Sequence, residues 1–482
     1  MREEIFRLER VTQIVGGVTL LDDLNLHIFK GEIMGLVCIN AHGKEALVKL
    51  LCQNVPIHYG RVYFQETLVN NYEHSSMSMN KVSVIEKQSS LVEDLTVSDN
   101  IFIMRRGFKK YLINRKILNE QFEKIAEELD IDIDGSQMVS NLSFFEKCVV
   151  ELLKAVITDA KLIVIRDISN FISATDIFKI HDLIRHFSKL GISFLYICNH
   201  HEEAFKICDR ISLMENGKIL KILNKKEFKD EMITPYTLDF SIKESSAIHK
   251  ISRNGILKFT DVATENIKDM SFTIEKGECV VFLDMNNTIL TDIVRLMLNE
   301  IKPLKGRILL DGFECTDKRF NLKKRVCFIQ ENPIQTMLFK GMSYIDNLCF
   351  LLGKKYPDIW LNNNIKKSII QEYGPLIGED IYANDITRIA PLSLYNLIYY
   401  RVHLYHPDIV FCMQPFSGAD MYLRHHIIEL INQLRKKKIT VVILSVNLSD
   451  TLTVADRLML IERGQLRKEY RSEEFHFFRA NQ

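Results

Sequence analysis

The first half of the chain contains a turn that could hold the phosphates of a nucleotide. Such a turn follows a strand, opens a helix and has the spacing G-x-x-x-x-G-K-[S/T]. Its glycines let backbone N–H groups approach the phosphates, its lysine reaches the outer phosphates, and its hydroxyl holds Mg²⁺. Residues 38–45 read CINAHGKE, so Gly43 and Lys44 are in place and Asn40 lies inside the turn. Cys38 replaces the first glycine and Glu45 replaces the hydroxyl, which predicts a partly degenerate phosphate-binding turn.

The matching stretch of the second half, residues 284–291, has lost most of this chemistry. It reads DMNNTILT, in which only Thr291 fits the pattern. Ile289 stands where glycine is expected, and a β-branched residue resists a positive φ. Leu290 stands in place of the lysine, and the carboxylate of Asp284 would repel an anion. We therefore favour an ordinary strand–turn–helix over a phosphate site here.

These two turns belong to an internal duplication. Landmarks recur in the same order at spacings of 246 to 250 residues, too long a period for a solenoid. The matched landmarks are Lys30-Gly31-Glu32 with Lys276-Gly277-Glu278, Gly60-Arg61 with Gly306-Arg307, Asn100-Ile101 with Asn347-Leu348, Leu142-Ser143 with Leu392-Ser393, Asp209-Arg210 with Asp456-Arg457, and Gly217 with Gly464. A polar stretch, 225–255, separates the halves. The sequence predicts two domains, residues 1–240 and 250–482.

Short apolar runs alternate with helical patterns in each half. In the first half the runs 33–37, 161–165, 194–198 and 211–214 read as buried strands, and 42–52 and 115–130 read as helices. Alternation of this kind predicts an α/β domain with a largely parallel sheet.

Composition limits the class of protein. The chain has 63 basic and 62 acidic residues, and this balance gives no reason to expect a nucleic-acid partner. Its ten cysteines show no metal-binding spacing and read as reduced thiols of a cytosolic protein, so we expect no structural metal. No run approaches the roughly 18 apolar residues of a membrane helix, so we expect any membrane contact to be made through a partner.

Several longer stretches carry a family resemblance. They include LDDLNLHI at 21–28, LTVSDNIF at 95–102, HEEAFKICDRI at 201–211 and MSYIDNL at 342–348. With them the chain resembles the ATP-binding subunit of carbohydrate-import ABC transporters of the ribose/galactose/xylose type, over about 4–222 and 255–474. The resemblance implies two tandem P-loop NTPase-like ABC ATPase domains, each a mixed, mostly parallel sheet with a helical subdomain. It also implies ATP and Mg²⁺ as cofactors.

The family's roles fall on altered residues in the first half. The Mg²⁺-associated aspartate becomes Arg166, and Asp167 takes the place of the catalytic glutamate. The switch histidine survives as His200. The adenine-stacking aromatic falls near Val15, and the glutamine that couples Mg²⁺ to the membrane partner falls at Lys87.

The signature segments are altered as well. LSGGQ becomes LSFFE from Leu142 and Ser143 onward, and LSLYN from Leu392 and Ser393 onward. Gln414 replaces the second-half catalytic glutamate, which removes a general base. In the family each ATP lies between the phosphate loop of one cassette and the signature of the other, so both composite sites should fail to hydrolyse ATP.

Glu45 raises a narrower question. Its carboxylate, at a helix N-terminus beside Lys44, could take the place of a phosphate and keep the first site shut. It could equally be a solvated acid of the first helical turn.

We expect a pseudo-ATPase that serves as a docking or regulatory subunit on an integral-membrane permease at the inner face of the cell membrane. The family implies a periplasmic or extracellular solute-binding protein too, and a catalytically competent cassette could be a further partner. The alternatives are a weakly active ATPase energising carbohydrate import, favoured by Lys44, Asp167 and His200, and a soluble regulatory scaffold. The sequence does not name a transported solute.

Overall fold

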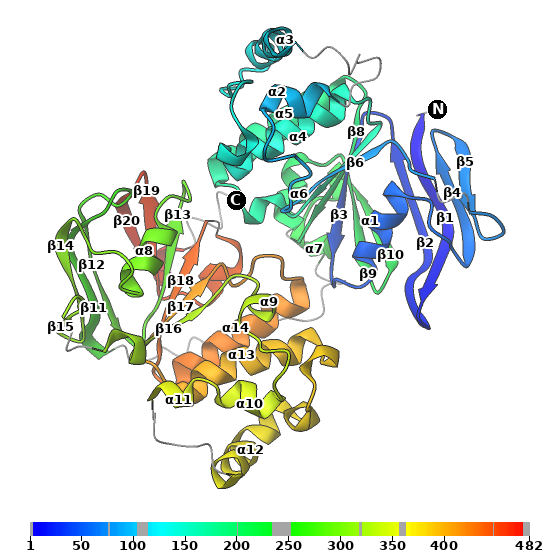
Figure 1. The fold of residues 1–482 in the computed structure, drawn as a ribbon. Helices are drawn as coiled ribbons and strands as arrows, with labels where there is room; N and C mark the ends of the chain where they lie inside the picture. The colour runs from blue at the N-terminus through cyan, green and yellow to red at the C-terminus, as the bar shows by residue number, and fades with distance from the viewer. Residues whose placement is uncertain are drawn as a thin grey trace. The chain divides into compact units, whose positions relative to one another are not determined.

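The chain folds into two compact units, Met1–Phe240 and Ser241–Gln482 (Figure 1). The computed structural model describes residues 3–75, 78–103, 114–199, 201–233, 252–317, 321–355, 363–446 and 448–475. Among these described residues, no helix combines the length and the apolar character needed to cross a membrane.

The first unit contains two sheets. A four-stranded antiparallel sheet has the order β2-β1-β4-β5, and a six-stranded sheet has the order β10-β9-β3-β8-β7-β6. The six-stranded sheet is parallel except for β10, which runs antiparallel to β9. The strands are β1 (Glu4–Val15), β2 (Val18–Phe29), β3 (Ile33–Cys38), β4 (Tyr59–Phe64), β5 (Thr67–Asn71), β6 (Val82–Ile85), β7 (Leu162–Arg166), β8 (Ser193–Cys198), β9 (Arg210–Glu215) and β10 (Lys218–Asn224).

The helices of the first unit follow the strands as the alternation predicts. They are α1 (Lys44–Cys52), α2 (Val97–Phe102), α3 (Arg115–Glu128), α4 (Phe144–Ile157), α5 (Ala174–Lys189), α6 (His201–Ile207) and α7 (Asp230–Ile233). Short 3₁₀ helices lie at Val139–Asn141, Ile168–Asn170 and Lys225–Glu227.

The second unit repeats this topology. Its antiparallel sheet is β12-β11-β14-β15, and its six-stranded sheet is β20-β19-β13-β18-β17-β16, again with the last strand, β20, antiparallel to β19. The strands are β11 (Ser252–Ala263), β12 (Met270–Lys276), β13 (Cys279–Asp284), β14 (Lys305–Leu310), β15 (Phe313–Glu314), β16 (Val326–Ile329), β17 (Ile409–Met413), β18 (Thr440–Ser445), β19 (Arg457–Glu462) and β20 (Gln465–Arg471). The helices are α8 (Leu290–Met297), α9 (Pro333–Thr336), α10 (Tyr344–Cys349), α11 (Leu352–Lys355), α12 (Asn363–Ile377), α13 (Pro391–Tyr405) and α14 (Met421–Lys436).

Two hydrophobic cores flank each six-stranded sheet. In the first unit, α1 and one face of the six-stranded sheet pack against the antiparallel sheet, and helices α2 to α6 pack against the opposite face. Figure 1 shows α1 between the two sheets of this unit. All six residues of β3 and of β13 are buried, which explains why these central strands read as continuous apolar runs. The expected fold of tandem α/β units with mixed, mostly parallel sheets is confirmed.

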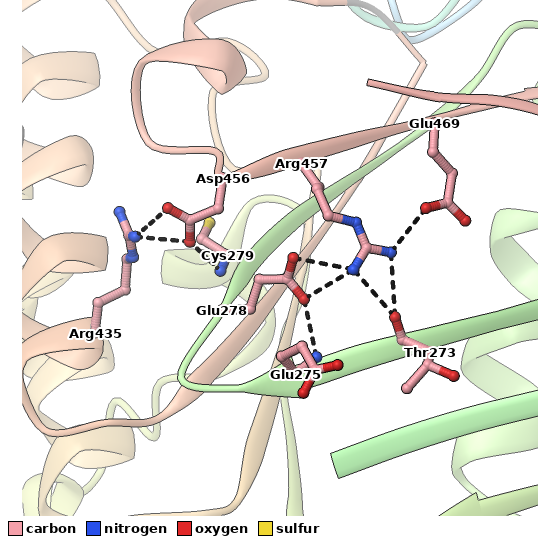
Figure 2. A network of polar contacts seen from close by, with 8 residues as sticks. All are labelled: Thr273, Glu275, Glu278, Cys279, Arg435, Asp456, Arg457 and Glu469. Atoms are coloured by element: carbon pink, nitrogen blue, oxygen red, sulfur yellow. Dashed lines mark hydrogen bonds and ion pairs between the residues drawn. The ribbon is translucent and has the colours of Figure 1, made fainter. Parts of the chain in front are cut away.

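The duplication extends to individual polar contacts. In the second unit Arg457 bonds to the carboxylate of Glu278 at 3.1 Å and to the carbonyl of Thr273, as Figure 2 shows. In the first unit Arg210 bonds to Glu32 at 2.6 Å and to the carbonyl of His27.

A second pair of contacts repeats beside the first. Asp456 accepts the N–H of Cys279 at 2.8 Å, and Asp209 accepts that of Ile33 at 3.0 Å. These networks join the start of each central strand to the strand beside it. The glutamate of Lys-Gly-Glu and both residues of Asp-Arg thus make the same contacts in each unit.

Candidate functional site

The turn from β3 to α1 joins a strand to a helix at the predicted place. Gly43 is the N-cap of α1 with φ +80°, and a Cβ there would lie 2.4 Å from the carbonyl oxygen of Leu20, so only glycine fits. The side-chain oxygen of Asn40 accepts the N–H of Asn216 at 3.1 Å, which ties the turn to the β9–β10 hairpin. Residues 38–45 therefore lead from a strand into a helix, with a glycine that no other residue could replace.

Lys44, however, is engaged within the protein. Its ammonium forms an ion pair with the carboxylate of Asp167, the residue after β7. The side chains are 10% and 17% exposed. Asp167 has φ +49°, and its N–H donates to the carbonyl of Ile197 at 2.9 Å, which holds it beside the end of β8. The cation that should reach a phosphate is neutralised by a residue predicted for the same site.

Arg166 forms a second ion-pair group beside the first. Its guanidinium pairs with Glu45 and, at 2.9 Å, with Glu86. Glu45 is 75% exposed and its carboxylate is directed to Arg166, so the solvated first-turn acid describes it better than a phosphate substitute. Glu86 was not predicted for this site, because nothing in its local sequence marks it as a partner of Arg166.

The charges of this cluster do not suit a nucleotide with Mg²⁺. Lys44 and Arg166 supply two positive charges, and three carboxylates, those of Glu45, Glu86 and Asp167, supply negative ones. Divalent magnesium needs oxygen ligands, and the position of the family's aspartate carries a guanidinium instead. These residues do not fit ATP·Mg²⁺ as they stand.

Other residues predicted for the first site are less informative. The Lys87 ammonium lies 4.3 Å from the centre of the Phe171 ring, a cation–π contact, at the position expected to carry glutamine. Val15 is exposed on β1 and offers no aromatic face. His200 lies outside the described residues.

The signature segment of the first unit begins a helix. Ser143 is the N-cap of α4 and forms a capping box with Glu146, whose carboxylate accepts the Ser143 N–H at 2.7 Å. Leu142 is buried, and the Phe144 ring packs edge-on against Phe171 at 5.5 Å. The donors at this helix start are thus partly satisfied by the carboxylate of the same segment.

The second signature segment, which begins at Leu392, does not start its helix as the first signature segment does. The N-cap of α13 is Ala390, which lies 247 residues after Ser143, and β17 likewise starts 247 residues after β7. Leu392 and Ser393 are therefore the second and third residues of the helix, the former exposed and the latter buried. The structural counterpart of Ser143 is Ala390, and the dipeptide match at a spacing of 250 aligns different turns of the two helices.

The second phosphate turn differs from the first in its backbone. Ile289 is the N-cap of α8 with φ −108°, so the left-handed geometry of Gly43 is absent at this position. Leu290 is buried and Thr291 is exposed at the start of the helix. Gln414 matches Asp167 in backbone only: it has φ +43° and donates its N–H to the carbonyl of Leu444 at 2.8 Å.

Comparison with known proteins shows what the chain is similar to. Residues 21–167, from β2 to the end of β7, match the family model described as ABC transporter. An RNase-L inhibitor has the same fold over 98% of this chain and 93% of its own, with a TM-score of 0.61 at 17% identity. The chain has the fold of tandem ABC ATPase-like domains. We refer to Met1–Phe240 as the first cassette and to Ser241–Gln482 as the second.

Curated relatives extend the likeness over both cassettes. The ribose import ATP-binding protein RbsA of Clostridium perfringens is 24% identical over 98% of this chain and 96% of the relative. The galactose/methyl galactoside import ATP-binding protein MglA of Haemophilus influenzae is 24% identical over 96% of this chain and 93% of the relative. The resemblance to tandem ATP-binding subunits of carbohydrate-import ABC transporters, expected from the sequence, is confirmed.

Proposed function

We propose that this tandem cassette protein is a hydrolysis-deficient subunit, a pseudo-ATPase, that serves as a docking or regulatory component of a carbohydrate-import system. The observation that carries the proposal is the ion pair between Lys44 and Asp167. In this contact Lys44, the cation expected to bind phosphate, is paired with Asp167, the residue at the position of the catalytic base.

The neighbouring ion pairs support the same conclusion. Arg166, held by Glu45 and Glu86, fills the position where the family keeps a metal-associated carboxylate. A positive group there disfavours a divalent cation, and the three carboxylates disfavour a triphosphate. In the second cassette, Leu290 and Gln414 supply neither a cation nor a base.

The partners follow from the relatives, which are named as import ATP-binding proteins. The proposal places the chain at the inner face of the cell membrane on an integral-membrane permease, fed by a periplasmic or extracellular solute-binding protein. A catalytically competent cassette could supply the energy that this chain does not. The ion pairs of Arg210 and Arg457 occur in both cassettes. They would stabilise the folded surfaces that dock to a partner.

The decisive experiment measures ATP turnover and nucleotide binding by the purified full-length chain, with and without Mg²⁺. We expect phosphate release at the background level and the same rate for the Lys44→Ala variant. Steady phosphate release that is lost in Lys44→Ala would instead establish the alternative, a weakly active transport ATPase.

A second experiment separates the docking role from a soluble scaffold role. The tagged chain is purified from detergent-solubilised membranes and from the soluble fraction of the same cells. The proposal expects an integral-membrane permease to co-purify. A soluble protein partner, without permease in either fraction, would favour the regulatory scaffold.

A further inference from the structure

The turn that follows β13 contains a fully buried carboxylate. Asp284 is the last residue of β13 and is 0% exposed. Its Oδ2 accepts the backbone N–H of Thr288 at 2.6 Å and of Ile289 at 2.7 Å, and its Oδ1 accepts that of Asn286 at 3.2 Å. One side chain thus bonds three N–H groups of the turn that leads into α8.

Hydrogen bonds from N–H groups to an ionised acceptor are short and strong. Within the part of the chain that the structure describes, no lysine or arginine forms an ion pair with Asp284. The backbone dipoles of the turn and the start of α8 are therefore the groups on which this buried negative charge depends.

The first cassette has a turn of the same length that differs in backbone at its helix start and lacks this carboxylate. Cys38 ends β3 as Asp284 ends β13, and both precede an asparagine that is tied to the neighbouring hairpin. That asparagine is Asn40 in the first cassette and Asn286 in the second, where it accepts the N–H of Arg463 at 2.9 Å. The bond from the asparagine to the hairpin is shared, and the aspartate is particular to the second cassette.

Backbone N–H groups converging in a turn after a strand form a concavity that binds anions. We propose that Asp284 is a built-in anion that occupies this concavity permanently, in the place of a phosphoryl group. The second cassette then keeps its turn and α8 ordered with no phosphate-bearing ligand. This inference rests on the proposed loss of nucleotide use and deepens it for the second cassette.

The proposal predicts that a phosphoryl-type anion can replace the missing carboxylate. In the full-length chain, Asp284→Gly should lower the melting temperature, and inorganic phosphate should restore it. At 20 mM phosphate we expect a recovery of roughly 2–4 °C over potassium chloride of equal ionic strength, with little change in the wild type. A matched control is Asp261→Gly, which removes an exposed aspartate of the same unit at φ +49°. A folded Asp284→Gly protein that gains no more from phosphate than this control would overturn the proposal.

A measurement on the wild-type chain covers the case in which Asp284→Gly does not fold. Amide hydrogen exchange of Thr288 and Ile289 should be slow and unchanged by ATP·Mg²⁺ or by phosphate. Protection that appears only after either is added would show that Asp284 does not fill the turn. If ATP turnover is found while these amides remain protected and unchanged, the proposed function fails and the role of Asp284 stands.

Discussion

The ammonium of Lys44 and the carboxylate of Asp167 form an ion pair between the first residue of α1 and the residue after β7. The family resemblance implies a phosphate-binding lysine at the first position and the catalytic carboxylate at the second. Here the ammonium of Lys44 bonds to Oδ2 of Asp167 across 123 residues of sequence. The contact links the start of α1 to the end of β7.

The first prediction concerns the strength of this pair. Lys44→Met, Asp167→Asn and the double variant should give a coupling free energy of about 1–2 kcal/mol in chemical unfolding, because both side chains are largely buried. The control is the exposed pair of Lys30 and Glu3, whose side chains are 50% and 51% exposed. Its coupling should be close to zero. Equal coupling in the two cycles would contradict a structural role for the Lys44–Asp167 pair.

The second prediction concerns magnesium. Glu45→Ser alone should not create Mg²⁺-dependent nucleotide binding, because Arg166 still occupies the position of the metal-associated carboxylate. Adding Arg166→Asp restores both a hydroxyl and a carboxylate, and we expect affinity for a fluorescent ATP analogue to rise roughly ten-fold in Mg²⁺ over EDTA. A Mg²⁺-dependent gain in Glu45→Ser alone would revive the view of Glu45 as the group that shuts the site.

The third prediction uses the two helix starts that the structure aligns. Ser143 caps α4, and its replacement by alanine should destabilise the first unit by about 1 kcal/mol. Ala390, its counterpart, forms no side-chain cap on α13, so Ala390→Ser should stabilise the second unit by about 0.5–1 kcal/mol. Chemical unfolding of both variants measures these shifts. If Ser393→Ala behaved as the cap variant and Ala390→Ser had no effect, the structural alignment would be wrong.

The fourth prediction concerns acid stability. His181 on α5 is buried and its Nε2 lies 3.1 Å from the hydroxyl oxygen of Tyr196. Burial lowers the pKa of His181 from 6.5 to about 4. Below pH 6.5 His181 is protonated in the unfolded chain but stays neutral in the folded chain. The contribution of His181 to the free energy of unfolding is therefore complete above pH 6.5 and falls as the pH drops towards 4. The loss is about 3 kcal/mol at most.

Unfolding free energies measured from pH 4 to 7 test this dependence. His181→Gln should flatten the slope, and His186→Gln, which changes an exposed histidine of the same helix, should leave it unchanged. An unaltered slope in His181→Gln would show that another group causes the acid lability.

The sequence by itself determined the duplication, the alternation of strands and helices, and the loss of individual motif residues. Each of these depends only on residues that are close together in the chain. Apolar runs indicate strands, residue spacing indicates the phosphate turn, and the loss of a glycine or lysine can be read at a single position. The Lys-Gly-Glu and Asp-Arg landmarks were visible in the same way, although their shared role in one network around Arg210 or Arg457 was not.

Only the tertiary structure decided which groups meet. The partner of Lys44 depends on β7 and β3 both flanking β8, and the partner of Arg166 depends on β6 lying beside β7. The start of α13 at Ala390 could not be read from a dipeptide, because packing against the sheet sets the register of that helix. Asp284 looked repulsive to a phosphate in the sequence, and its carboxylate proved to bond the amides that a phosphate would need. Contacts of this kind arise from strand order and chain reversal, which local residue preferences do not encode.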